Sequence, residues 1–385
     1  MNIKWVFFAV LTTFFVLATS SRVLAVNTRD IDNVAKKAAI DDQDKKIIDD
    51  FLAEAVQELV KTKDFTSIAK LRAVILSRKG SQGQYAQQFS ESAYKYIKVG
   101  LEQAQTLRPD ERKNNVIINL LILIDGMEDL RLTDLAMGML KDQNMVIRYW
   151  AVHCLTNPAI LQQLNSQTAS TPDLAATIVE QLKGIIQTSK PEILVHIARF
   201  GANINIPEGE QLLLQVADER IKRYANWTVT CEFYDITILK LLENKILVSS
   251  QNISTSVPAA TDGTPAAARS FAQLYFYVIR RYIKSYNTLN DDQKQQLASV
   301  IIEIEENCVA RLLGLNRSQG ALRRAIEQDN LTALSDESKK LLGDETSSGQ
   351  LPLKLGFDYG TNPNGSKRTA PIPLPDKPQK PTANN

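Results

Sequence analysis

The residues from Asp142 to Leu155 constrain the fold more than any other stretch of this 385-residue chain. Asp142 and Asn144 carry short side chains with acceptor oxygens, which suit a tight turn and the free N–H groups at a helix start. After the turn, apolar residues recur every three or four positions, the spacing that lines one face of a helix. The stretch therefore predicts a helix that is entered from a capped turn and buried along one side. Its apolar positions are Val146 or Ile147, Ala151, Cys154 and Leu155.

A second short amphipathic helix is predicted directly before this turn, with apolar residues Leu132, Leu135, Ala136, Met139 and Leu140. Two helices joined by a short turn form a helical hairpin. Such a hairpin cannot bury both of its apolar faces alone, so it must stack on neighbouring hairpins. The pattern therefore predicts a stacked array of helices.

At these positions the stretch resembles a HEAT repeat, whose second helix follows an Asp-containing turn and has an apolar residue and Arg, then Ala, then Leu. The matching residues are Asp142, Ile147, Arg148, Ala151 and Leu155. The resemblance implies that Asp142 and Arg148 belong to a ladder of turn carboxylates and arginines that ties successive repeats. It covers about one repeat, and the rest of the chain shares only the helical rhythm.

Helical patterns continue along most of the remaining chain. We predict helices at residues 42–61, 66–78, 84–107, from 109 onward, 172–186, 191–200, 207–224, 225–248, 266–286, 290–313, 319–328 and 331–342. Residues 249–268 are rich in Ser, Thr, Ala, Gly and Pro, which predicts a mobile loop. The expected fold is all-α: an α-solenoid of stacked antiparallel helical hairpins, about eight of them, over residues 26–342.

The first 25 residues are typical of an export signal. Lys4 provides a positive start, residues 5–18 are apolar and uncharged, and the segment 23–25 supplies small residues before a cleavage site. This apolar run is shorter than the about 20 residues that span a bilayer. We expect cleavage after Ala25 and an exported bacterial protein, periplasmic or extracellular, that does not span the membrane.

The charge balance argues against a nucleic-acid partner. The chain has 45 basic and 43 acidic residues, and removal of Lys4 and Arg22 with the signal makes the two equal in number. General nucleic-acid binding requires a positive surface, which a balanced composition does not supply.

Residues 343–385 form a Gly- and Ser-rich segment that becomes proline-rich and holds half of the chain's 14 prolines. Their low apolar content predicts a disordered tail with local polyproline II conformation. The main interpretation is a spacer. A docking peptide for an aromatic groove is the alternative.

The three cysteines lie at equal intervals, and a tryptophan precedes each of the first two by four positions (Trp150 before Cys154, and Trp227 before Cys231). The interval to Cys308 is the same, close to twice the roughly 40 residues of a HEAT unit, so an internal repeat is one explanation. A small buried side chain is the main interpretation of each cysteine. A Cys154–Cys231 disulfide is the alternative in an oxidising compartment.

No catalytic motif is present: there is no phosphate-binding glycine loop, nucleophile elbow or zinc-protease helix. We interpret the two histidines, His153 and His196, as structural or surface residues. Glu303, Glu305 and Glu306 are interpreted as a solvated helix face, with general acid–base catalysis as the alternative. We therefore predict no catalytic residue, no cofactor and no metal site.

The segment 271–286 is the richest in aromatic residues, which alternate with Arg280, Arg281 and Lys284. Aromatic and cationic side chains together can stack on bases or sugar rings. The spacing of Phe271, Leu274, Val278 and Tyr282 favours core packing instead. The candidates for a binding surface are Trp150, Tyr277 and Arg281.

The function predicted from these features is a non-enzymatic interaction scaffold of the cell envelope or periplasm. Stacked repeats create a continuous surface, and its partner would be a protein or an envelope polymer. One alternative is an all-helical secreted enzyme acting on polysaccharide. Another is a glycan-binding module that uses the aromatic residues between Tyr275 and Tyr286.

Overall fold

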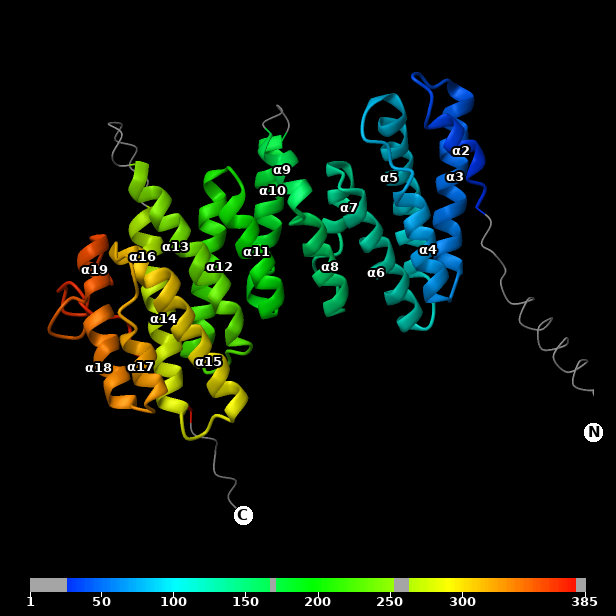
Figure 1. The fold of residues 1–385 in the computed structure, drawn as a ribbon. Helices are drawn as coiled ribbons and strands as arrows, with labels where there is room; N and C mark the ends of the chain where they lie inside the picture. The colour runs from blue at the N-terminus through cyan, green and yellow to red at the C-terminus, as the bar shows by residue number, and fades with distance from the viewer. Residues whose placement is uncertain (1–25, 167–170, 253–262, 379–385) are drawn as a thin grey trace, which may run out of the picture. The chain divides into compact units, whose positions relative to one another are not determined.

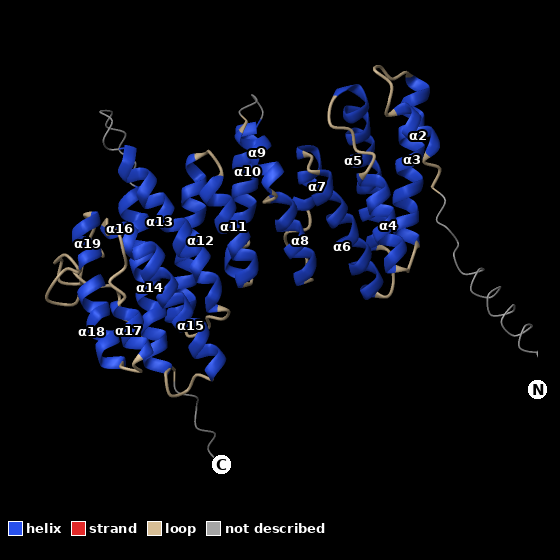
Figure 2. Ribbon diagram, viewed as in Figure 1, coloured by secondary structure: helices blue, strands red, loops and turns tan. Residues whose placement is uncertain are grey.

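The computed structural model describes residues 26–166, 171–252 and 263–378. Within these ranges the fold is all-α with no strand (Figure 2), as predicted. The β-type pairing in these ranges consists of two isolated bridges, Gly343 with Ser348 and Thr361 with Lys367. The predicted signal segment, residues 1–25, lies outside the described residues.

The chain divides into two compact units, Met1–Trp150 and Ala151–Asn385, with the boundary inside helix α8 (Met145–Leu155). In the first unit α3 packs on α5 and α4 packs on α6, the pattern expected when one helical hairpin stacks on the next (Figure 1). The helices of this unit before α8 are α2 (Arg29–Val34), α3 (Asp42–Lys61), α4 (Phe65–Leu76), α5 (Gly83–Gln105), α6 (Asp110–Met127) and α7 (Thr133–Met137).

Helix α3 shows why these segments are helical. A capping box opens it: the Asp41 carboxylate accepts from the Asp44 N–H, and the Asp44 carboxylate accepts from the Asp41 N–H. One face, including Ile48, Leu52 and Leu59, is fully buried, and burial of each such side chain stabilises the fold by about 1.5–3 kcal/mol. The neighbouring α5 approaches closely at Gly100, where an added Cβ would lie 2.8 Å from Val56 Cγ1.

The second unit repeats this stacking. Helix α10 packs on α12, α11 on α13, α12 on α14, and α13 on α15. Helices α11 and α12 approach closely at Gly201, where an added Cβ would lie 2.8 Å from the Gly209 carbonyl oxygen. The remaining elements of this unit are α9 (Pro158–Asn165), α10 (Thr171–Lys183), α11 (Pro191–Asn203), α12 (Pro207–Ala225), α13 (Asp235–Asn252), α14 (Gly263–Ser285), α15 (Asp291–Ile304), a π-helical turn (Glu305–Val309), α16 (Ala310–Leu313), α17 (Ala321–Glu327), α18 (Leu331–Leu342) and α19 (Gln350–Leu355).

The prediction of one helix over residues 225–248 is wrong at its start. Helix α12 ends at Ala225 and α13 begins at Asp235. Between them lies a loop in which Trp227 (φ 58°) and Cys231 (φ 52°) have left-handed backbones. Such values interrupt a helix, because β-carbons are crowded there. The Trp227–Cys231 pair therefore does not repeat the Trp150–Cys154 pair, which lies within α8.

The predicted mobile loop, residues 249–268, is narrower in the structure. Helix α13 continues to Asn252 and α14 begins at Gly263. Ala267 and Ala268 are buried on α14, which explains why an alanine-rich stretch joins the helix. The part of the predicted loop at residues 253–262 lies outside the described residues.

The C-terminal segment differs from the prediction of disorder over residues 343–385. It contains α19, and Phe357, Tyr359 and Leu374 are buried after it. Burial of these side chains compensates for the conformational entropy that the segment loses when it becomes ordered. The proline-rich composition had suggested that no such compensation was available. Residues 379–385 lie outside the described residues.

None of the helices in the described ranges has the length and apolar content that crossing a membrane requires.

Candidate functional site: a groove along α14

Helix α14 is a central element of the second unit, packed against α12, α13, α15 and α18. Its predicted apolar stripe is buried: Phe271, Leu274 and Val278 are fully buried, and Tyr282 is 4% exposed. This confirms core packing for these residues. Of the other aromatic residues, Tyr275 and Tyr277 are also buried, whereas Phe276 and Tyr286 are half-buried.

A second face of α14 holds part of the C-terminal segment. Gln273, Tyr277, Arg281 and Lys284 follow one another at intervals of three or four residues and therefore share a face of the helix. Three of them contact residues 371–376, which we call the strap. The strap has no regular secondary structure and follows α14 in the same chain direction.

We call the surface formed by this face of α14 and the Trp227 side chain the groove. Its side chains donate to four successive carbonyl groups of the strap. Gln273 Nε2 donates to the Ile372 carbonyl (3.0 Å), and Tyr277 Oη reaches the Pro373 carbonyl at 3.5 Å. Lys284 Nζ donates to the Leu374 carbonyl (2.8 Å), and Trp227 Nε1 donates to the Pro375 carbonyl (3.0 Å). Gln273 Oε1 also accepts from the Ile372 N–H (2.7 Å). The groove therefore recognises an extended backbone, whose polar groups have no partners within the strap.

The buried side chains of the strap recur every third residue. Pro371 and Leu374 are buried, whereas Ile372, Pro373 and Pro375 are exposed. This spacing matches the three residues per turn of polyproline II, which predicts that one edge of such a helix faces the protein. At the end of the strap, Lys284 Nζ lies 2.7 Å from Asp376 Oδ1. The hydrogen bond from Lys284 lowers the pKa of Asp376.

The loop between α12 and α13 positions Trp227. The Arg281 guanidinium carbon lies 4.8 Å from the centre of the indole ring, a cation–π contact. Arg281 also lies 3.9 Å from Glu232 of the same loop and donates to Ser285 Oγ (3.0 Å). Burial raises the pKa of Glu232, although the charge of Arg281 opposes this shift. Arg281 therefore joins α14 to the loop that carries the indole donor.

A buried ion pair closes this loop. Arg220 donates to both carboxylate oxygens of Asp235 (2.6 and 2.9 Å) and to the Thr230 carbonyl (3.1 Å), and Tyr224 donates to Asp235 (2.7 Å). Arg220 and Asp235 are fully buried. Burial lowers the pKa of Arg220, but the charge and hydrogen bonds of Asp235 outweigh this and raise it. We call Arg220, Tyr224 and Asp235 the clasp, because together they join the two ends of the loop.

Further contacts direct the chain toward the groove before the strap begins. Tyr359 Oη donates to the Leu342 carbonyl (2.7 Å), and Thr369 Oγ1 donates to the Asp344 carbonyl (2.6 Å). The chain passes close to Gly343 (φ 103°), where an added Cβ would collide with the Thr369 carbonyl oxygen. Beside the strap, Phe276 and Arg280 help to line an open hollow of about 700 Å³.

The structure brings two of the three predicted binding residues, Tyr277 and Arg281, into one site. The third, Trp150, lies in α8 with its ring against Tyr149 (5.8 Å between ring centres). The tryptophan that contacts the strap is Trp227. The sequence analysis placed Trp227 in a helix that does not form. It therefore did not predict that Trp227 and α14 belong to one site.

The residues of the HEAT-like motif lie in the turn before α8 and along that helix. Ile147, Ala151 and Leu155 are fully buried. Asp142 Oδ1 accepts from the Asn144 N–H (2.7 Å), and Asn144 Oδ1 accepts from the Val146 N–H (2.9 Å) at the start of α8. Arg148 donates to the Met145 sulfur at 3.5 Å. The ladder of Asp142 and Arg148 between repeats stays a prediction.

The three glutamates near the end of α15 all have partners. Glu303 pairs with Lys240 (2.6 Å) and Glu306 with Arg323 (2.7 Å). The interpretation of Glu305 as part of a solvated face is wrong, because this residue is only 5% exposed. It lies four residues after the buried Ile301, and its carboxylate accepts from the Leu322 and Arg323 N–H groups at the start of α17.

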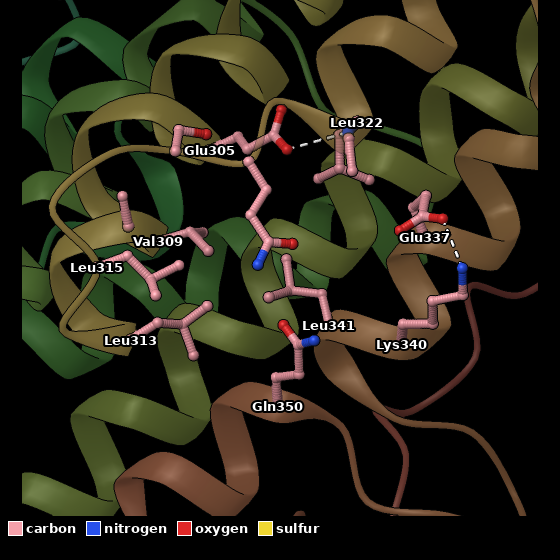
Figure 3. Close-up of a pocket in the computed structure, with 13 residues that line it drawn as sticks. Glu305, Val309, Leu313, Leu315, Leu322, Glu337, Lys340, Leu341 and Gln350 are labelled. Carbon is pink, nitrogen blue, oxygen red and sulfur yellow. Dashed lines mark hydrogen bonds and ion pairs between the residues drawn. The ribbon is translucent and has the colours of Figure 1, made fainter.

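Glu305 also lines a small cavity between the π-helical turn and α18 (Figure 3). The cavity has a volume of about 40 Å³, far below the roughly 300 Å³ at which small-molecule sites begin. Its charged side chains have partners: Glu305 holds the start of α17, and Lys340 donates to Glu337 (2.6 Å). This cavity is therefore part of the packing.

The two histidines lie close to each other, and the three cysteines differ in how far they are buried. The rings of His153 and His196 lie 5.2 Å apart, a proximity that the sequence did not predict. Cys154 and Cys308 are buried, whereas Cys231 is exposed and forms no disulfide. Burial raises the pKa of the Cys308 thiol, and the neighbouring Glu243 carboxylate adds to this shift. In the described ranges, no three His, Cys, Asp or Glu side chains gather as a metal site would require.

Comparisons with known proteins add little to this geometry. No protein-family model and no curated protein matches the sequence. A crystal structure of an engineered protein is similar over 84% of this chain and 97% of its own chain, with 14% sequence identity and a TM-score of 0.28. A likeness at that TM-score indicates neither fold nor function.

Proposed function

We propose that this protein is an exported, non-enzymatic interaction scaffold of the cell envelope or periplasm, which binds extended segments of other polypeptides on its helical surface. One observation carries the proposal. The groove along α14 holds an extended chain through four successive carbonyl groups. A surface that binds its own chain in this way has the chemistry needed to bind another.

The helical-repeat architecture supports the same function. Stacked helices form rigid, continuous faces on which side chains from several elements converge. The groove is an example, since its contacts come from α14 and from the loop after α12. The resemblance of Asp142–Leu155 to a HEAT repeat and the export-like residues 1–25 agree with a scaffold that acts outside the cytoplasm.

The second candidate function, a glycan-binding module, has less support. It requires aromatic rings open to a sugar, but Tyr275, Tyr277 and Tyr282 are buried. A polysaccharide-degrading enzyme would require acidic groups converging on an open cleft. The three glutamates considered for that role are each paired or used to hold a helix start.

Site-specific photocrosslinking tests the proposed function. A benzophenone amino acid replaces Phe276, half-buried beside the strap, in the full chain expressed in its own host. The matched control places the same group at Phe65, which is 66% exposed on α4. We expect a defined polypeptide to crosslink at Phe276 and not at Phe65. The proposal fails if neither position captures a polypeptide and the purified chain instead cleaves envelope polysaccharide.

A further inference from the structure

The strap resembles a bound ligand more than a structural element. Its contacts with α14 and Trp227 are made by side chains of the groove to its backbone. Its own buried surface comes mainly from Pro371 and Leu374. Proline fixes the backbone close to polyproline II before binding, so little entropy is lost when the strap is seated. These are the features by which proline-rich peptides are recognised in aromatic-lined grooves.

The contacts of the strap with α14 end at Asp376. Asp376 is 97% exposed at its side chain, and its contact is an ion pair with Lys284. Residues 377 and 378 are exposed. Ile372 is 48% exposed although the flanking Pro371 is buried. The strap can therefore detach from this end while the packing of the helices on one another stays in place.

We propose that the groove is a binding site for a proline-rich segment of a partner protein, and that the strap occupies the site in cis as a competitor. The proposal rests on the proposed scaffold function and names its ligand class. The preferred ligand has the chemistry of Ala370–Asp376 in this chain: alternating prolines, a leucine between two of them, and an acidic residue after the last.

Each element of that ligand has a matching group in the groove. The leucine takes the buried position of Leu374, which is 3% exposed. The acidic residue pairs with Lys284, as Asp376 does. The residue between the first two prolines needs a free N–H and carbonyl for Gln273, which holds both groups of Ile372. A proline at that position would lose one of these two hydrogen bonds.

Because the strap competes in cis, a partner must bind the groove with enough affinity to displace it. A short tether gives an attached peptide an effective concentration on the order of millimolar. A free peptide of the same sequence therefore binds the native chain weakly, because only the fraction of molecules with an empty groove is competent. A change that unseats the strap but leaves the groove intact should strengthen binding of the free peptide.

The test uses a fluorescently labelled peptide with the sequence of residues 368–378 and the full mature chain. Fluorescence anisotropy gives its affinity for the native chain, for Leu374→Asp and for the matched control Leu353→Asp, whose leucine on α19 is 72% exposed. We expect Leu374→Asp to bind the peptide at least about tenfold more tightly than the other two chains. Adding Lys284→Ala to Leu374→Asp should weaken this binding, whereas adding Lys340→Ala should not.

Three results would overturn the inference. Equal binding by all three chains, unaffected by Lys284→Ala, would place the peptide elsewhere. No binding to Leu374→Asp, while Phe276 still captures a polypeptide in the crosslinking experiment, would reject this ligand class and leave the scaffold function standing. A native dimer in sedimentation that becomes a monomer in Leu374→Asp would show that the occupant is the strap of a second copy.

Discussion

The clasp beneath the groove yields the prediction that the structure constrains most. Replacing Asp235 by Ala leaves the Arg220 guanidinium fully buried without its carboxylate and removes the acceptor of Tyr224. Three charge-assisted hydrogen bonds are lost, each worth about 1.5–3 kcal/mol before relaxation. Removal of one partner of a buried ion pair costs about 3–5 kcal/mol in measured cases. We expect a loss of this size in the free energy of unfolding of the second unit.

A double substitution tests whether the loss of stability comes from leaving one buried charge unpaired. Arg220→Met with Asp235→Leu replaces both ions by apolar side chains, which is often neutral or stabilising by about 1–4 kcal/mol. The double variant should therefore be far more stable than Asp235→Ala. It should still alter the loop, because a methionine side chain cannot donate to the Thr230 carbonyl as Arg220 does.

Urea unfolding in a Trp150→Phe background provides the assay. In a chain that begins at Val26 and so lacks Trp5, Trp227 is then the reporter of the loop, and circular dichroism follows the helices. If Asp235→Ala lowers the free energy of unfolding by less than about 1 kcal/mol, the reasoning is refuted, because Arg220 must then reach water or a new partner. A double variant less stable than Asp235→Ala would refute it as well.

Three further predictions follow from local contacts. Gly201→Ala should destabilise the second unit by about 1–3 kcal/mol in thermal unfolding, since its Cβ would meet the Gly209 carbonyl; an unchanged midpoint would contradict the tight helix contact. Cys231 should react with a maleimide in the native chain, whereas the buried Cys308, whose pKa is raised, should react only after unfolding; equal rates would contradict the assigned burial. Hydrogen bonds from Thr346 and Ser347 lower the pKa of Asp344 from 3.8 to about 2. Because the folded pKa is depressed, this stabilisation is present above about pH 4 and is lost as the pH falls toward 2; exchange of the loop amides should rise over that range, and an identical profile in Asp344→Asn would reject the assignment.

The helices could be predicted from the sequence because their signals are local. Residues 42–61 and 331–342 were predicted with the bounds that α3 and α18 have. Both carry a cap residue before the first turn, Asp41 and Asn330, and a continuous apolar face. The spacing of the apolar residues and the cap residue together determine such a helix, whatever the rest of the chain does.

The groove could not be predicted, because its parts meet only in the folded chain. Tyr277 and Arg281 were candidates from their position on one helix, but their partners are Trp227 and the strap. Trp227 was assigned to a helix, since nothing in the local pattern reports a left-handed backbone fixed by the Arg220–Asp235 pair. The strap was predicted to be disordered for the related reason that its stabilising contacts lie about a hundred residues away in the sequence.

Glu305 illustrates the same limit for charged residues. Acidic side chains on a helix are usually solvated, and the run of three glutamates suggested an exposed face. Its position four residues after Ile301 placed it on the buried side. The carboxylate is tolerated there because two N–H groups of α17 donate to it. That partner lies in a different helix, which the sequence around Glu305 does not reveal.

The indole N–H of Trp227 offers the most direct measurement of the central claim, that the groove along α14 holds the strap. In ¹⁵N-labelled protein, Trp227→Phe assigns this NMR signal, and its exchange with solvent is measured in the native chain and in Leu374→Asp. The account predicts slow exchange in the native chain, where the N–H donates to Pro375, fast exchange in Leu374→Asp, and renewed protection when the free proline-rich peptide is added. Fast exchange in the native chain, or the same rate in both chains, would contradict the account.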